Sequence, residues 1–187
     1  MHPMRATVPL LCLFFLFLLA SDAQAAAEIS DFKVTVDGSR AMVSLKLERA
    51  FTSRLWERVG SGLPTSIVYR FLLEKDHKRW YDTQLQESTF EVLATYDAVE
   101  RQYAINYKLD GKLVESRTVH EPKELAAAMT RIDSLPLFTL DRLPQSWRLL
   151  IKARAELGAK TVLSLIPVNI TTEWIESRKF RGAGGEP

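Results

Sequence analysis

The side chains that could perform acid–base or metal chemistry are few in this chain and widely spaced. Beyond the first 25 residues there are two histidines, His77 and His120, and no cysteine. Neither histidine stands in an H-x-H or H-E-x-x-H pattern, and without thiolates a zinc site would need carboxylates from distant segments. These residue types and spacings predict neither a metal nor a cofactor.

Acidic residues near the histidines leave a hydrolytic site open as one hypothesis. Asp76 and Asp82 flank His77, and Glu121 follows His120. Each grouping also has a structural interpretation. Charged residues are typical of an exposed turn, and a glutamate is favoured near the N-terminus of a helix by the helix dipole.

Glycine-rich motifs add no catalytic signal. The segment GSG (60–62) is the nearest approach to the G-x-S-x-G turn of serine hydrolases, but glycines at a helix end have a sufficient backbone reason. Neither phosphate-binding pattern, G-x-x-x-x-G-K-[ST] or G-x-G-x-x-G, occurs. We therefore expect a protein that is not an enzyme.

Aromatic residues are the more informative group. Five of them fall on the apolar faces of predicted strands: Tyr69, Tyr96, Tyr103, Tyr107 and Trp147. They form either a packed core or the lining of a cavity for an apolar ligand, because both use the same residue types.

A second aromatic group follows the charged stretch LEKDHK (73–78). Arg79, Trp80 and Tyr81 stand at the exit of a predicted hairpin turn, where alternation should expose one of the two neighbouring rings. Either one ring caps the edge of the core, or the three residues form a patch where a partner docks.

The N-terminal segment predicts export. Arg5 precedes an apolar run from Val8 to Ala20, and Ala23 and Ala25 complete an A-x-A site. This order is that of a secretory signal peptide, with cleavage after Ala25 and a periplasmic or secreted product. The alternative is an uncleaved membrane anchor, although the apolar run is shorter than the roughly 20 residues of a spanning helix.

The length and the net charge of the chain limit its domain organisation and the classes of partner that it can bind. Residues 26–180 are predicted to form a single domain, followed by a flexible tail at 181–187. The net charge of +2 is unchanged by removal of residues 1–25. With positive and negative charges so nearly equal in number, the protein has no long-range electrostatic field that would attract nucleic acid. No stable membrane insertion is expected after cleavage.

Period-two alternation of apolar residues dominates the chain. It predicts a hairpin over 28–48 with a turn at Asp37-Gly38, and another over 102–119 with a turn at Asp110-Gly111. Further strands are predicted at 67–73, 90–96, 147–156 and 160–176, and Pro167 places an edge or bulge in the last.

Two short helices interrupt the strands. Phe51, Leu55 and Val59 are spaced as one helical face, and a second helix has Pro122 in its first turn. The predicted buried stripe of the second helix contains Leu125, Ala128 or Met129, and Ile132. The prediction is an antiparallel β-sandwich of about eight strands, Ig-like in general architecture, with two peripheral helices. The rival is one curved sheet wrapped over a helix.

Four segments together resemble a known family. They are LWERVGSGLPTSIVYRFLLEKDHKRWYD (55–82), ATYDAVERQYAI (94–105), EPKELAAAM (121–129) and ITTEWIESRKF (170–180). They are similar to the DUF4390 family of exported bacterial proteins, which has no established activity and no assigned catalytic residues. Members are often encoded beside a nitrogen-regulation-type sensor kinase, so the resemblance implies a role at the envelope side of such a system.

Three functional hypotheses follow. The first is an exported, non-enzymatic module that binds a protein partner in the bacterial envelope. The second is a carrier that holds an apolar ligand in an aromatic-lined cavity. The third is a hydrolase of envelope polymers that uses the scattered acids with His77 or His120.

Overall fold

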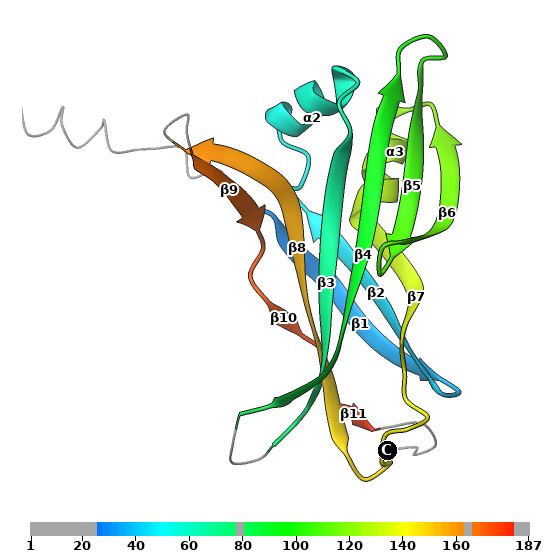
Figure 1. Cartoon of the computed structure of the whole chain (residues 1–187), viewed down its shortest axis with the longest axis vertical. Coiled ribbons are helices and arrows are strands. Elements are labelled where there is room, and N and C mark those ends of the chain that lie inside the picture. Colours follow the sequence, from blue (N-terminus) through cyan, green and yellow to red (C-terminus); the bar gives the residue numbers. More distant parts are fainter. Residues whose placement is uncertain (1–25, 78–80, 163–165, 182–187) are drawn as a thin grey trace, which may run out of the picture.

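The strands form two antiparallel sheets packed face to face (Figure 1). The structure is a computed structural model that describes residues 26–77, 81–162 and 166–181. Within these ranges no helix has the length and apolar character needed to cross a membrane. The predicted antiparallel β-sandwich is confirmed. The predicted signal segment, 1–25, lies outside the described residues.

Among the described residues the larger sheet has eight strands, and six of them follow the order β10-β8-β3-β4-β5-β6. Two further strands, β9 and β11, also pair with β8. The bounds are β3 Thr65–Lys75, β4 Thr83–Asp97, β5 Gln102–Leu109, β6 Lys112–Val119, β8 Arg148–Val162, β9 Ile166–Thr171, β10 Ile175–Glu176 and β11 Phe180–Arg181.

The smaller sheet and the two helices complete the domain. The sheet has the order β1-β2-β7, from β1 Glu28–Asp37, β2 Arg40–Glu48 and β7 Arg131–Thr139. Helix α3, Pro122–Thr130, contacts strands of both sheets, and Figure 1 shows it beside β2 and β7 against the same face of the large sheet. Helix α2, Ser53–Gly60, lies near the end where β3 begins.

Alternate residues of the strands fill the space between the layers. In β3, four consecutive inward positions are completely buried, which is the face that period-two alternation predicts. The same alternation buries four residues in β2 and five in β8. The thirteen residues are Ile67, Tyr69, Phe71, Leu73, Ala41, Val43, Leu45, Leu47, Leu149, Ile151, Ala153, Ala155 and Leu157.

Tight turns close the two predicted hairpins. Gly38 has a φ of +56°, and Asp110 and Gly111 have φ of +48° and +77°. These are the left-handed conformations that two-residue hairpin turns require and that glycine and aspartate tolerate. The Asp110 carboxylate also accepts hydrogen bonds from Ser88 Oγ at 3.0 Å and from the Thr89 N–H at 2.8 Å. The turn is thus fastened to β4.

Helix α2 begins later than its spacing of apolar residues predicts. Thr52 is the N-cap, with its hydroxyl 3.4 Å from the Leu55 N–H that it accepts. Phe51 therefore precedes the helix instead of belonging to it. Its ring packs on Trp56 with centroids 4.5 Å apart, so the two form a hydrophobic staple across the first turn.

Helix α3 continues directly into β7, a strand that the sequence did not predict. Ile132 was expected in the buried stripe of this helix, but it is buried as part of β7 instead. The helix ends at Thr130, and Arg131 is already extended, with a φ of −115° and a ψ of 130°. No glycine or proline marks this change, so the apolar periodicity runs across it.

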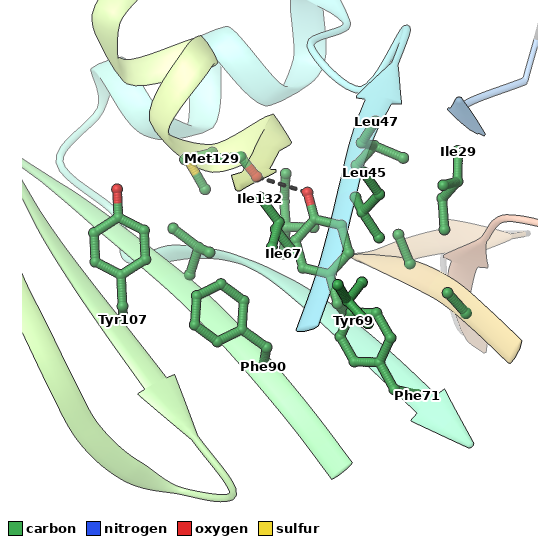
Figure 2. Close-up of a cluster of buried hydrophobic side chains, with 14 of the residues drawn as sticks. Ile29, Leu45, Leu47, Ile67, Tyr69, Phe71, Phe90, Tyr107, Met129 and Ile132 are labelled. Carbon is green, nitrogen blue, oxygen red and sulfur yellow. Dashed lines mark hydrogen bonds between the residues drawn. The ribbon is translucent and has the colours of Figure 1, made fainter. Parts of the chain in front are cut away.

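Two buried tyrosines hold the end of α3. The Tyr69 hydroxyl donates to the Met129 carbonyl at 2.7 Å (Figure 2), and the Tyr107 hydroxyl donates to the Ala128 carbonyl at 3.4 Å. The last carbonyls of a helix have no partner within the helix. These tyrosines of the large sheet therefore supply partners at the point where α3 becomes β7.

The C-terminal segment, predicted as a strand over 160–176 with an edge or bulge at Pro167, is divided among β8, β9 and β10. Between β9 and β10, Thr172 bonds Ala155 of β8 through both its backbone and its side chain: the Thr172 N–H donates to the carbonyl at 2.9 Å, and Oγ1 accepts the N–H at 3.0 Å. Ser177 does the same with Ile151 at 2.9 and 3.0 Å. Hydroxyls replace backbone carbonyls as acceptors, which breaks the regular ladder.

Replacing Tyr69 with phenylalanine tests the tyrosine–helix contact. The variant keeps the ring but leaves the buried Met129 carbonyl without its donor. We expect the free energy of unfolding to fall by about 1 to 2 kcal/mol in urea titrations. Tyr103→Phe is the control, because Tyr103 is partly exposed, so water can supply the hydrogen bonds that the lost hydroxyl made. Equal losses in both variants would contradict the proposed role of the bond.

Candidate functional site

The loop that connects β3 to β4 is where the sequence predicted a docking patch. Arg79 and Trp80 lie outside the described residues. Tyr81 is described, and 96% of its surface is exposed. It stands two residues before β4 begins, at the end of the molecule opposite to α2 (Figure 1). Because so little of its surface is buried, this large aromatic side chain contributes little to the stability of the fold.

Asp76 anchors this hairpin to the C-terminal segment. Only 7% of the Asp76 side chain is exposed, and its two carboxylate oxygens lie 2.6 Å from Lys179 Nζ and 3.4 Å from Arg148 Nε. The Asp76 N–H also donates to the Arg148 carbonyl at 2.8 Å. The hydrogen bond from Lys179, aided by the positive charges of Lys179 and Arg148, lowers the pKa of the Asp76 carboxyl against the opposing effect of desolvation.

The other residues of the hydrolase hypothesis at this hairpin have structural partners. The Asp82 carboxylate accepts the His77 N–H at 3.1 Å, so it closes the loop across the hairpin. Nε2 of His77 lies 3.1 Å from Thr83 Oγ1. These contacts shape the two ends of the connection between β3 and β4.

His120 and Glu121 belong to the opposite end of the domain. Glu121 is the N-cap of α3, and a capping box joins it reciprocally with Glu124. The Glu124 carboxylate lies 3.4 Å from the His120 N–H. In Figure 1 the end of β3 and the start of β4 lie at the opposite end of the molecule from the start of α3, so the fold does not bring the two histidine-containing groups together.

The five aromatics that sequence analysis singled out occupy two environments. Tyr69 is completely buried and Tyr107 is 7% exposed, and both are core residues whose hydroxyls bond α3. Tyr103 and Trp147 are partly buried and pack against this core. The rings of Tyr96 and Tyr103 pack in a tilted arrangement with centroids 4.8 Å apart, and Lys75 Nζ lies 4.0 Å above the Trp147 ring.

The outer face of the large sheet carries rows of paired charges that sequence analysis did not single out. Arg70 lies between two acids, with Nε 2.8 Å from Glu156 and Nη1 3.3 Å from Glu87. Arg154 also contacts Glu156 at 3.3 Å, and its guanidinium lies 4.7 Å above the ring of Trp174. The alternation of charged with apolar residues in β3 and β8 was the available signal, but cross-strand partners depend on register.

A second row continues the same pattern. Lys152 Nζ lies 2.9 Å from the Glu74 carboxylate and 3.2 Å from that of Glu176. The pKa of Lys152 is raised, chiefly by the hydrogen bond to Glu74 and next by that to Glu176. Because each cation has an acid beside it, this face presents little net charge to a partner. Within the described ranges, no group of three or more histidines and acids is arranged to hold a metal ion.

The fold and its surface define a β-sandwich protein in which acids such as Asp76, Asp82, Glu121 and Glu156 make hairpin, capping and cross-strand contacts. A family model described as "Domain of unknown function (DUF4390)" matches residues 24–174, and the chain belongs to this family. The resemblance of the four sequence segments is thereby confirmed. No curated protein and no solved structure matches the chain.

Replacing Asp76 with asparagine tests the anchor of the hairpin through pH dependence. The pKa of Asp76 is lower in the folded protein than its ordinary value of 3.8, so its contribution to stability is present above that value and is lost as pH falls through the lowered pKa. We expect the variant to be less stable at pH 7 and to lose less stability than the wild type during acidification below about pH 4.

Thermal melts at a series of pH values measure this difference. Asp141→Asn, at an exposed position in the connection between β7 and β8, is the matched control. Parallel acid profiles of Asp76→Asn and the wild type would show that the ion pairs with Lys179 and Arg148 contribute nothing measurable.

Proposed function

We propose that the chain is an exported, non-enzymatic module that acts by binding a protein partner in the bacterial envelope. The observation that carries the proposal is Tyr81, whose side chain is 96% exposed beside a hairpin fixed by the Asp76 ion pairs. Exposed tyrosines on a rigid support are typical centres of protein interfaces, because they bury a large area and lose little rotamer freedom.

Export is supported by the pattern of the first 25 residues, which combines Arg5, an apolar run and an A-x-A site. The family resemblance suggests an envelope sensor protein as the partner. The positive and negative charges of the chain are nearly balanced, and those on the outer face of the large sheet are paired. This charge distribution suits a protein partner better than a polyanion.

The non-enzymatic part of the proposal rests on the partners of the ionisable groups. Asp76 binds two cations, Asp82 closes the hairpin and Glu121 caps α3. A general base must instead be able to reach a proton of the substrate. Tyr69 and Tyr107, which would line the cavity of a carrier, have their hydroxyls bonded to α3 within the core.

Affinity capture from detergent-solubilised envelopes tests the proposal. The tagged protein is expressed in a bacterium that encodes it, and captured proteins are quantified by mass spectrometry. We expect Tyr81→Ala to reduce recovery of the partner about tenfold, because loss of an aromatic anchor weakens binding by more than 1 kcal/mol. The melting temperature should stay unchanged, since Tyr81 buries almost nothing.

Val99→Ala is the matched control. Val99 is 92% exposed in the β4–β5 turn, at the other end of the molecule. If the wild type recovers no protein above background, or if Tyr81→Ala and Val99→Ala recover the same amount of a partner, the proposed binding surface is wrong.

A further inference from the structure

The edge of the large sheet is formed by an unusually exposed strand. Among the described residues β6 pairs on one side only, with β5. Seven of its eight residues are exposed, and Val119 is partly buried. The exposed residues include Leu113 and Val114, at 61% and 54% of their surface. An edge of this kind presents unpaired backbone N–H and C=O groups to any strand of matching length.

The order of residues in β6 is complementary to itself. An antiparallel copy paired about Ser116 places Glu115 opposite Arg117 of the second copy, and Arg117 opposite its Glu115. Opposite charges directly across an antiparallel pair stabilise it, whereas like charges oppose it. Registers displaced by one residue lose this match, because they place Glu115 opposite Ser116 or Thr118, and a displacement of two residues can place Glu115 opposite Glu115.

The remaining pairs of this register are also compatible. Thr118 and Val119 come opposite the exposed Val114 and Leu113 of the second copy, so apolar and β-branched side chains meet at both ends. The register of β6 with β5 shifts between Tyr107 and Lys108, which places the irregularity before Glu115. The three central pairs, from Glu115 to Arg117, lie in the regular part of the strand.

Arg117 and Ser116 already have contacts with β5 before any association. The guanidinium of Arg117 lies 5.3 Å above the ring of Tyr107, a core residue of β5. Ser116 Oγ donates to Asn106 Oδ1 at 2.7 Å on the neighbouring strand. Side chains that are already positioned lose less entropy when a partner arrives.

We propose that two copies of the chain associate through β6, antiparallel about a two-fold axis at Ser116, to form one continuous sheet across the dimer. The interface is isologous, because each copy contributes both Glu115 and Arg117. One strand pair buries little area, so the association is weak and depends on concentration. The β6 edge is a different surface from the loop that contains Tyr81, so the proposed dimer does not depend on the partner proposed above.

Sedimentation velocity tests the inference, using the protein recovered from cells that express the full chain. Concentrations from about 1 µM to about 1 mM cover weak association. We expect the wild type to move from monomer to dimer across this range. Glu115→Arg and Arg117→Glu should each weaken dimerisation about tenfold or more, because each places two pairs of like charges in contact.

Mixing the two variants gives the decisive measurement. Glu115→Arg has arginine at both positions and Arg117→Glu has glutamate at both, so the mixture should form a heterodimer although neither variant dimerises alone. The double variant Glu115→Arg/Arg117→Glu should dimerise again. Lys33→Glu, which reverses an exposed charge in β1 of the smaller sheet, should behave as the wild type.

The mixture also separates pairing from folding, since Arg117→Glu removes the contact with Tyr107. Circular dichroism melts establish that each variant is folded before it is mixed. A wild type that stays monomeric at every concentration, a dimer that neither reversal weakens, or folded variants that fail to associate when mixed would each overturn the proposal.

Discussion

The hydrogen bonds from Tyr69 and Tyr107 to the last carbonyls of α3 determine how the two layers are joined. Where a helix ends inside a buried layer, its last backbone carbonyls need hydrogen-bond donors from the protein, because water is not present to supply them. The large sheet provides the two hydroxyls, at 2.7 and 3.4 Å, from inside the core. The chain can then change from helix to strand at Arg131 without a loop, and β7 adds to β2 in the smaller sheet. Burial raises the pKa of both tyrosines, so they remain proton donors.

This arrangement also decides which surfaces remain available. The inner faces of the sheets are used by the core, and the outer face of the large sheet is used by ion pairs such as Arg70–Glu156 and Lys152–Glu74. The loop beyond β3 and the β6 edge are among the surfaces that carry exposed apolar or aromatic residues, with Tyr81 at the first and Leu113 and Val114 at the second. Both proposals therefore concern contacts at the margins of the sheets, where backbone and aromatic groups meet solvent.

Alternation predicted most of the strands because one face of each strand is buried. The residues from Ile67 to Leu73 are an example, since every second side chain is completely buried. The prediction failed where no residue marked the boundary between two elements, or where one apolar pattern ran across both of them. No breaker residue separates α3 from β7, so Ile132 was assigned to a helix. At the candidate site, the sequence pattern suggested that one aromatic would be exposed, and Tyr81 is. The placement of Asp76 between Arg148 and Lys179 could not be predicted, because these residues are far apart in the chain.

The sequence alone determined the elements whose causes are local. Periodicity specified the strands, Asp110-Gly111 specified a turn with positive φ, and Pro122 with the glutamates beside it specified the start of a helix. Tertiary structure decided what depends on register and on layers: whether a tyrosine at an inward position packs or lines a cavity, which charges pair across strands, and which strand is left at the edge. The physical reason is that these contacts join distant residues, such as Tyr69 with Met129, so their geometry exists only after the sheets have packed.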